Sequence, residues 1–230
     1  MEVNLDNWYK PKIDKRKLRE LSKRSDLKGL SHFFLYFLFL FVFGYLAYIT
    51  WGTLWSIIFF FIYGTIYSFS VSNWHETVHK TAFKRRWLNE IFYHISSFMC
   101  DFEGFRWRWS HTFHHTYTLQ TEGDYDHEIQ VSRPTELFAF FLNYIPFSDL
   151  LYPHKLIKFE VLKHALGYLT PVVSISAPKD QKKKIIWNSR VYVFIWISVI
   201  AFSFYIESIL PIFYIILPTY YGKPIWFAVN

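Results

Sequence analysis

The sequence predicts an all-α membrane protein with two transmembrane helical hairpins and a cytosolic helical cap that carries clustered histidines. Hydrophobic residues make up 52% and aromatic residues 23% of the chain, which is typical of membrane proteins with aromatic belts at both interfaces. Residues 29–73 contain no Asp, Glu, Lys or Arg, so they can enter a bilayer. The mean hydropathy of the whole chain is only slightly positive, so a sizeable polar part must accompany the apolar spans.

We expect one domain over residues 1–230, which begins with a basic arm and a transmembrane hairpin. The arm, residues 1–28, is interpreted as a juxtamembrane segment that lies on anionic lipid. Residues 29–73 would measure about 65 Å as one straight helix, about twice the thickness of the bilayer core. They are therefore predicted to form a hairpin of two spans, residues 31–50 and 54–73.

Residues 74–188 are predicted to form the cytosolic and interfacial cap. In chain order we expect an amphipathic helix at residues 87–100 and a second helix at 106–116. A polar loop at 119–134, an interfacial apolar segment at 135–152 and a basic amphipathic helix at 154–168 follow. His94 is expected to pack or to form hydrogen bonds within the first helix. His154 and His164 are expected to be ordinary polar positions on surface helices.

Residues 189–230 are predicted to form a second, truncated hairpin. Its two spans begin at Val191 and Leu210, and Glu207 and Pro211 mark the turn between them. The chain is therefore expected to be a multi-pass protein of a bacterial inner membrane or of the endoplasmic reticulum.

The distribution of charge and the single cysteine exclude several other classes of protein. A net charge of +7 is compatible with nucleic-acid binding, but lysines and arginines flank the apolar runs, as expected next to anionic lipid. Their placement predicts that the arm, the 80–86 loop, both histidine clusters and the 178–184 loop are cytoplasmic. Cys100 has no partner for an intrachain disulfide, and it is expected to be a buried small apolar residue.

Half of the ten histidines fall in two short motifs. The first motif is His75-Glu76-Thr77-Val78-His79, with histidines at i and i+4. The second contains His111, His114 and His115, which lie within an arc of about 100° on a helix. Imidazole is the commonest metal-binding side chain, so the two motifs predict a transition-metal site.

The chemistry of the two motifs admits more than one metal. HExxH alone is typical of a zinc protease in which the glutamate acts as general base. The second motif opposes this interpretation, because it adds three histidines to a site that needs only four ligands. Five imidazoles cannot complete two octahedral shells, which need about ten positions, so water, a bridging oxygen or further ligands must complete a two-metal site.

The order of the motifs resembles the integral-membrane fatty acid desaturase family. An HExxH motif directly follows a transmembrane hairpin, and W-R-W-S-H-T-x-H-H follows it. The match is tightest from Trp74 to Ile129 and includes Thr81-Ala82-Phe83 and Trp87-Leu88-Asn89. The resemblance implies a four-helix membrane fold with a cytosolic cap that holds two iron ions, and it implies five ligands: His75, His79, His111, His114 and His115.

The resemblance also implies an activity and partners. A desaturase uses O2 and two electrons to introduce a double bond into an acyl chain, which is carried by CoA, a carrier protein or a lipid. The electrons are expected from a ferredoxin or a cytochrome b5, because the chain has no heme-binding HPGG motif and no cluster of cysteines. A lipid hydroxylase with the same site and an HExxH zinc metalloprotease remain alternatives.

One departure from the family concerns its third histidine motif, which is not found after His115. Only His127, His154 and His164 follow, each of them isolated. We therefore expect this chain to be the N-terminal fragment of a longer desaturase whose missing ligands follow Asn230.

Five polar residues near the motifs are candidates for supporting roles. Glu76, Asp124 and Asp126 are candidates for accepting a hydrogen bond from a ligand imidazole. Arg106 and Arg108 alternate with tryptophans ahead of the second motif. They are interpreted either as contacts for a substrate phosphate or an acidic electron donor, or as side chains that snorkel to the membrane interface.

Overall fold

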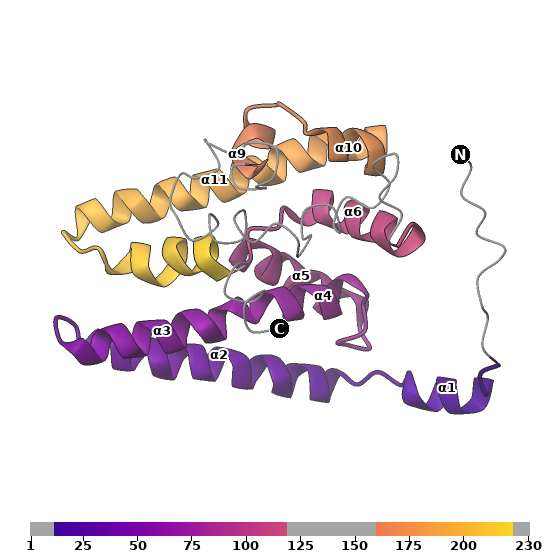
Figure 1. The fold of residues 1–230 in the computed structure, drawn as a ribbon, viewed down its shortest axis with the longest axis horizontal. Helices are drawn as coiled ribbons and strands as arrows, with labels where there is room; N and C mark the ends of the chain where they lie inside the picture. The colour runs from indigo at the N-terminus through magenta and orange to yellow at the C-terminus, as the bar shows by residue number, and fades with distance from the viewer. Residues whose placement is uncertain (1–11, 119–159, 223–230) are drawn as a thin grey trace.

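The computed structural model describes residues 12–118 and 160–222, and every regular element within these ranges is a helix (Figure 1). The all-α prediction is therefore confirmed for this part of the chain. Three helical segments are long and apolar enough to cross a membrane: Asp26–Ile49, Leu54–Val78 and Lys179–Tyr205. A fourth apolar helix, Ile212–Gly222, is shorter, and its first turn is the π-helix η5 (Ile212–Ile216).

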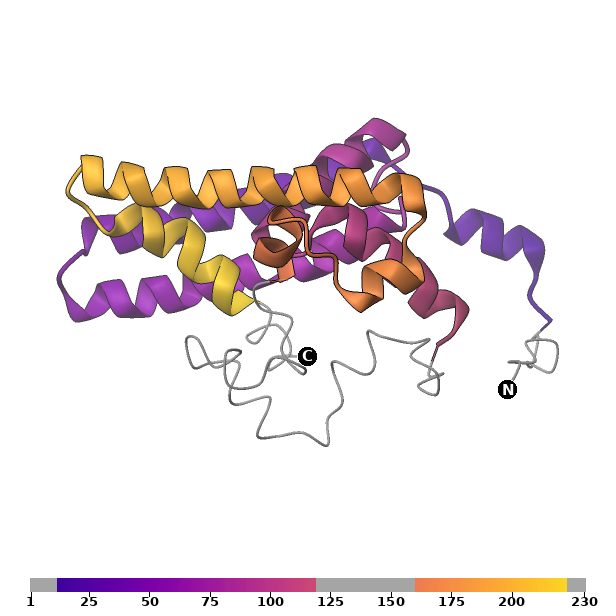
Figure 2. The same cartoon turned by 90° about the horizontal axis from the view of Figure 1, so that it is seen from above.

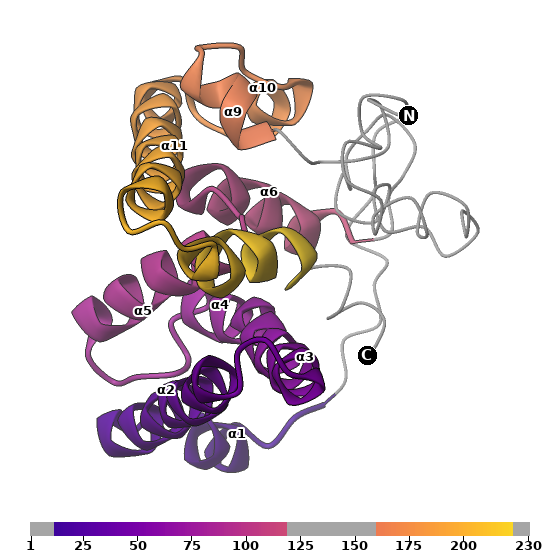
Figure 3. The same cartoon turned by 90° about the vertical axis from the view of Figure 1, so that its left-hand side faces the viewer.

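The first hairpin consists of α2 (Asp26–Ile49) and α3 (Leu54–Ser68), which lie side by side along their length (Figures 1 and 3). Ser25 caps the start of α2, where its Oγ accepts a hydrogen bond of 3.4 Å from the amide of Lys28. The chain reverses between the two helices at Gly52, whose φ of +85° lies in the left-handed region that glycine adopts without strain.

Helix α4 (Ser70–Val78) continues α3 after a change of direction at Phe69, so the first histidine motif ends the second membrane-length segment. Helices α5 (Arg86–Met99) and α6 (Gly104–Thr116) follow and lie between the first hairpin and α11 (Lys182–Tyr205) (Figure 3). These helices form part of the predicted cap.

Two short helices, α9 (Glu160–Ala165) and α10 (Pro171–Ser176), and the 3-10 turn η4 (Lys179–Gln181) lead into α11. Helix α9 packs against α11, and α10 packs against α6. The predicted loop at 119–134, the interfacial segment at 135–152 and the first part of the 154–168 helix lie outside the described residues.

Helix α1 (Lys15–Leu21) lies within the basic arm and has no buried residue. It extends beyond the end of the bundle, on the side where the cap helices gather (Figure 2). The long helices expose large apolar side chains, for example Phe41 (70% exposed), Ile57 (66%) and Phe194 (70%). Such surfaces are suited to lipid rather than to water.

An aromatic core joins the two histidine helices. Trp74 of α4 meets Trp107 of α6 edge to face, and Phe102 stacks on Trp107 with ring centroids 3.8 Å apart. Tyr93 and Cys100 from α5 complete the same cluster, and both are 0% exposed. Cys100 is thus the buried small residue that the sequence predicts.

Candidate metal centre

Helices α4 and α6 bring four of the five predicted ligand histidines together. His75 and His79 are four residues apart on α4 and at its C-cap, and His111 and His115 are four residues apart on α6. Residues at this spacing lie on one face of a helix, so two helices that pack face to face present four imidazoles to one point. The ligand atoms of the four residues all lie within 4.8 Å of one another.

Three of these histidines form a tight triangle of nitrogen atoms. The Nε2 atom of His111 lies 3.0 Å from Nε2 of His79, and Nε2 of His115 lies 3.2 Å from each of them. A neutral imidazole nitrogen either donates or accepts a hydrogen bond, so three such atoms cannot all satisfy one another. A shared cation would satisfy all three lone pairs at once.

The size of the triangle matches the coordination shell of one transition-metal ion. With metal–nitrogen bonds of about 2.1 Å, ligands at right angles are about 3.0 Å apart and tetrahedral ligands about 3.4 Å apart. The observed edges of 3.0 to 3.2 Å fall in this range. His75 is placed to be a fourth donor, because its ring centroid lies 4.7 Å from that of His79 and 4.9 Å from that of His111.

The cluster also favours the neutral imidazoles that a metal requires. The pKa of His79 is lowered to about 4, mainly because burial disfavours its charged form, and also because His111, His75 and His115 lie close to it. Near pH 7 the His79 ring is therefore neutral and can donate a lone pair.

Aromatic packing holds the ring of His111, one of the three histidines of the triangle, in place. This residue is 5% exposed, and its ring meets Trp74 edge to face with centroids 5.1 Å apart. His115 lies on the exposed side of the cluster. The site is thus closed by aromatic side chains on one side and accessible on another.

His114, the fifth predicted ligand, does not belong to this group of four. Its ring centroid lies 5.7 Å from that of His111 and 5.5 Å from that of His115. It follows His111 by three residues, and it is half-buried at the edge of the cluster. The four-histidine arrangement therefore leaves His114 next to the site rather than within the group.

Of the three proposed hydrogen-bond acceptors, only Glu76 lies within the described residues. One carboxylate oxygen is 4.0 Å from Nδ1 of His75, and the other accepts a hydrogen bond of 2.9 Å from the hydroxyl of Thr81. Glu76 is thus close to the predicted ligand His75, although its carboxylate is too far from Nδ1 for a hydrogen bond. Asp124 and Asp126 lie outside the described residues, as does His127.

The two arginines ahead of the second motif bind acidic side chains within the protein. Arg106 is 1% exposed, and its Nε lies 3.0 Å from the carboxylate of Glu160. Its Nη1 donates a hydrogen bond of 2.8 Å to the hydroxyl of Ser110. Arg106 is therefore enclosed, which leaves no surface for the expected substrate contact or for snorkelling.

Arg108 is only partly buried. It forms an ion pair of 2.6 Å with Glu90 of α5, and its guanidinium lies over the ring of Tyr93. Lys80 reaches the same Glu90 carboxylate at 3.6 Å. These pairs connect the loop after the first motif to α5 and α6.

His164 does not occupy the surface position that the sequence interpretation assigned to it. Its side chain is 0% exposed, and its Nε2 lies 3.0 Å from the hydroxyl of Thr170 and 3.9 Å from the Glu160 carboxylate. Lys163, a basic residue of the predicted surface helix, is exposed on α9, whereas its neighbour His164 is buried. The short helix α9 packs against α11, and one face of α9, which includes His164, is buried.

Glu103 is a supporting residue that the sequence interpretation missed. Its carboxylate caps α6 and accepts hydrogen bonds from the amides of Phe105 and Arg106, at 3.2 and 2.7 Å, and from the side chain of Asn188. An acidic residue directly before the helix that carries the second motif was the available signal. Glu160 was also missed, because no local sequence pattern indicates that it pairs with Arg106, 54 positions away.

A comparison with protein-family models matches residues 49–230 to the fatty acid desaturase family. No curated protein and no solved structure matches the chain. The matched range covers most of the chain and contains both histidine motifs, the cap helices and the second and third membrane-length segments. The chain therefore belongs to the fatty acid desaturase family.

Proposed function

We propose that this protein is a membrane-bound oxidoreductase that introduces a double bond into an acyl chain at an iron site held by His75, His79, His111 and His115. The observation that carries the proposal is the group of four imidazoles at the end of a membrane-length helix, in a chain of the desaturase family. Bound iron supplies the oxidising power that is needed to break unactivated carbon–hydrogen bonds, with O2 and two electrons as co-reactants.

The protein contributes position and enclosure. Helices α4 and α6 hold the donor nitrogens at spacings that suit an ion, so little reorganisation is needed when metal binds. Trp74 and Trp107 keep water away from the buried side of His111. The exposed side of the cluster, at His115, is where we propose that substrate and metal enter.

We propose two iron ions, as the family resemblance implies. The four clustered imidazoles are sufficient donors for one ion, and a second ion needs further donors. His114 is the nearest additional histidine among the described residues that belongs to a motif, and we assign it to the second ion.

We further propose that the histidines are on the cytosolic side. The cationic segments in α1, in the loop after the first motif and at the start of α11 lie at the same end of the long helices as the histidines (Figure 1). The turn between α2 and α3, at the opposite end, contains no lysine or arginine. This asymmetry matches the positive-inside rule. The acyl group would be carried by CoA, a carrier protein or a lipid, and the electrons would come from a ferredoxin or a cytochrome b5.

The decisive experiment is expression of the whole reading frame that contains these residues, in a host without its own desaturase and together with an electron-donor system, followed by mass spectrometry of the acyl chains. We expect a product two hydrogens lighter than its precursor, and we expect His111→Ala to reduce it to the background level. Thr112→Ala, an exposed neighbour on the same helix, is the matched control and should retain activity.

Three other outcomes would contradict the proposal. A hydroxylated product with no unsaturated one would identify a hydroxylase that uses the same site. Purified protein that contains zinc and no iron, and that cleaves peptides, would favour the metalloprotease. Equal product from the His111→Ala variant and the unmodified protein would separate the activity from the histidine cluster.

A further inference from the structure

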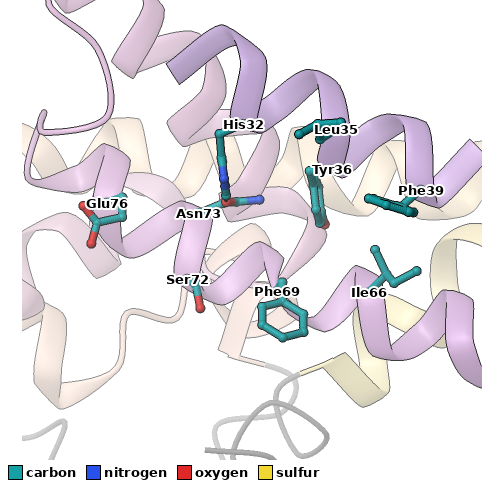
Figure 4. Close-up of a pocket in the computed structure, with 9 residues that line it drawn as sticks. All are labelled: His32, Leu35, Tyr36, Phe39, Ile66, Phe69, Ser72, Asn73 and Glu76. Atoms are coloured by element: carbon teal, nitrogen blue, oxygen red, sulfur yellow. The ribbon is translucent and has the colours of Figure 1, made fainter. Parts of the chain in front are cut away.

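A cavity of about 400 Å³ lies between α2 and the α3–α4 pair, and its lining residue Glu76 is next to His75 of the first histidine motif (Figure 4). One wall is formed by side chains of α2, including His32, Leu35 and Phe39. The volume is in the range of pockets that bind small molecules.

The cavity is polar at one end and apolar at the other. His32 begins the α2 wall and Phe39 ends it two turns further on, and the antiparallel wall runs from Ile66 to Asn73 and Glu76. Both walls therefore place their polar residues at the end near the basic arm and their apolar residues deeper in the membrane-length segments (Figure 4). This gradient matches an amphiphile with its headgroup at the interface and its chain in the bilayer.

The polar end contains a hydrogen-bond donor without an acceptor. Asn73 is 4% exposed, and its Oδ1 lies 2.8 Å from Nε2 of His32. Its Nδ2 has no hydrogen-bond partner within the described residues. A buried donor that lacks an acceptor is costly, so an oxygen atom of a ligand, such as an ester carbonyl, would stabilise this end of the cavity.

The charge at the polar end of the cavity determines which lipid headgroups are favoured there. Among the described residues that line the cavity, Glu76 is the only charged one, and its side chain is 62% exposed. Within the described ranges, no lysine or arginine lines the cavity. A carboxylate ligand would therefore meet like charge without a compensating cation, whereas an ammonium group would pair with Glu76.

We propose that this cavity binds a bilayer phospholipid with an ammonium-bearing headgroup, with one acyl chain along Leu35, Phe39 and Ile66 and the ammonium at Glu76. The contacts that support this site do not include the four clustered histidines. Glu76 lies beside His75, but lipid binding is measured directly and not through turnover, so its failure and the failure of the proposed oxidation chemistry are distinguishable.

The test is native mass spectrometry of the purified full chain in detergent, titrated with phosphatidylethanolamine or phosphatidylglycerol that carry identical acyl chains. We expect one phosphatidylethanolamine to bind with a Kd about tenfold lower than that of phosphatidylglycerol. Ile66→Trp, which fills the apolar end, should weaken phosphatidylethanolamine binding about tenfold. Ile57→Trp is the matched control, because Ile57 lies on the same helix but outside the cavity.

Glu76→Gln provides a second test that does not alter the volume. It should remove the preference for phosphatidylethanolamine over phosphatidylglycerol while the chain-binding part of the site is preserved. Equal affinity of the unmodified protein for the two lipids would overturn the proposal, as would tighter binding of oleate than of phosphatidylethanolamine. Equal losses in Ile66→Trp and Ile57→Trp would also overturn it, since they would place the effect outside the cavity.

Discussion

Arg106 and Glu160 form an ion pair that is almost completely enclosed, with Nε of Arg106 3.0 Å from the carboxylate and side-chain exposures of 2% and 8%. Arg106 precedes His111 by five positions on α6, and Glu160 begins α9, which packs against α11. Thr170 extends the pair by donating a hydrogen bond of 2.8 Å to Glu160. A buried ion pair thus connects α6, which carries the second histidine motif, to α9, which packs against the membrane-length helix α11.

Breaking this pair from one side should be strongly destabilising. Arg106→Met leaves the Glu160 carboxylate buried without its partner, which costs about 3–5 kcal/mol of unfolding free energy. The double variant with Glu160→Met should recover much of this loss, because no buried charge remains. Arg16→Met is the control, since the Arg16–Glu20 pair is exposed and contributes about 0.5 kcal/mol or less. Denaturant unfolding in detergent measures all four proteins, and equal losses for Arg106→Met and Arg16→Met would refute the prediction.

Glu103 should make stability depend on pH. Burial raises the pKa of this carboxyl to about 7, whereas in the unfolded chain it ionises near pH 4.3. Between these values the folded protein holds a proton that the unfolded chain releases. The Glu103 contribution to the unfolding free energy therefore falls as pH rises from about 4.3 to 7, and it is constant above that range.

Comparison with Glu103→Gln isolates this effect, because His94 and His164 titrate equally in both proteins. Burial lowers the pKa of these two histidines, so their contribution is lost as pH falls. We expect the Tm of the unmodified protein, measured relative to that of Glu103→Gln, to decrease between pH 5 and pH 7. A constant difference across this range would show that Glu103 has an ordinary pKa.

Metal content should respond differently to the three kinds of histidine. His111→Ala removes a buried donor from the triangle and should remove at least the ion that the four clustered histidines hold. His114→Ala should lower iron per chain from two ions to one, in accordance with the assignment of His114 to the second ion. His164→Ala should reduce thermal stability, because it empties a buried position, but should leave iron per folded chain unchanged. Elemental analysis of the purified proteins provides the measurement, and full iron content in His111→Ala would exclude the site.

Topology can be tested by labelling cysteines introduced at Glu20, Gln181 and Gly52 in intact cells. The first two positions lie at the histidine end of the bundle, and the third lies in the turn at the opposite end (Figure 1). A membrane-impermeant maleimide should label Gly52→Cys from outside and should label the other two only after lysis. External labelling of Gln181→Cys would invert the proposed orientation.

The sequence by itself determined the features that depend on local patterns. The uncharged stretch from 29 to 73 determined the first hairpin, because charged residues cannot remain unpaired in the bilayer core. The i, i+4 spacing within each motif determined that each pair of histidines shares a helix face. The apolar stripe at residues 87–100 indicated a helix that the structure places at Arg86–Met99.

The tertiary structure decided which residues meet across long separations. His79 and His111 are 32 positions apart, and only the packing of α4 against α6 around Trp74 determines that they converge while His114 stays beside the group. Arg106 and His164 look like surface residues in the sequence because helical periodicity does not specify what covers each face. Arg106 is paired with Glu160, 54 positions away, and His164 is buried on α9, which packs against α11.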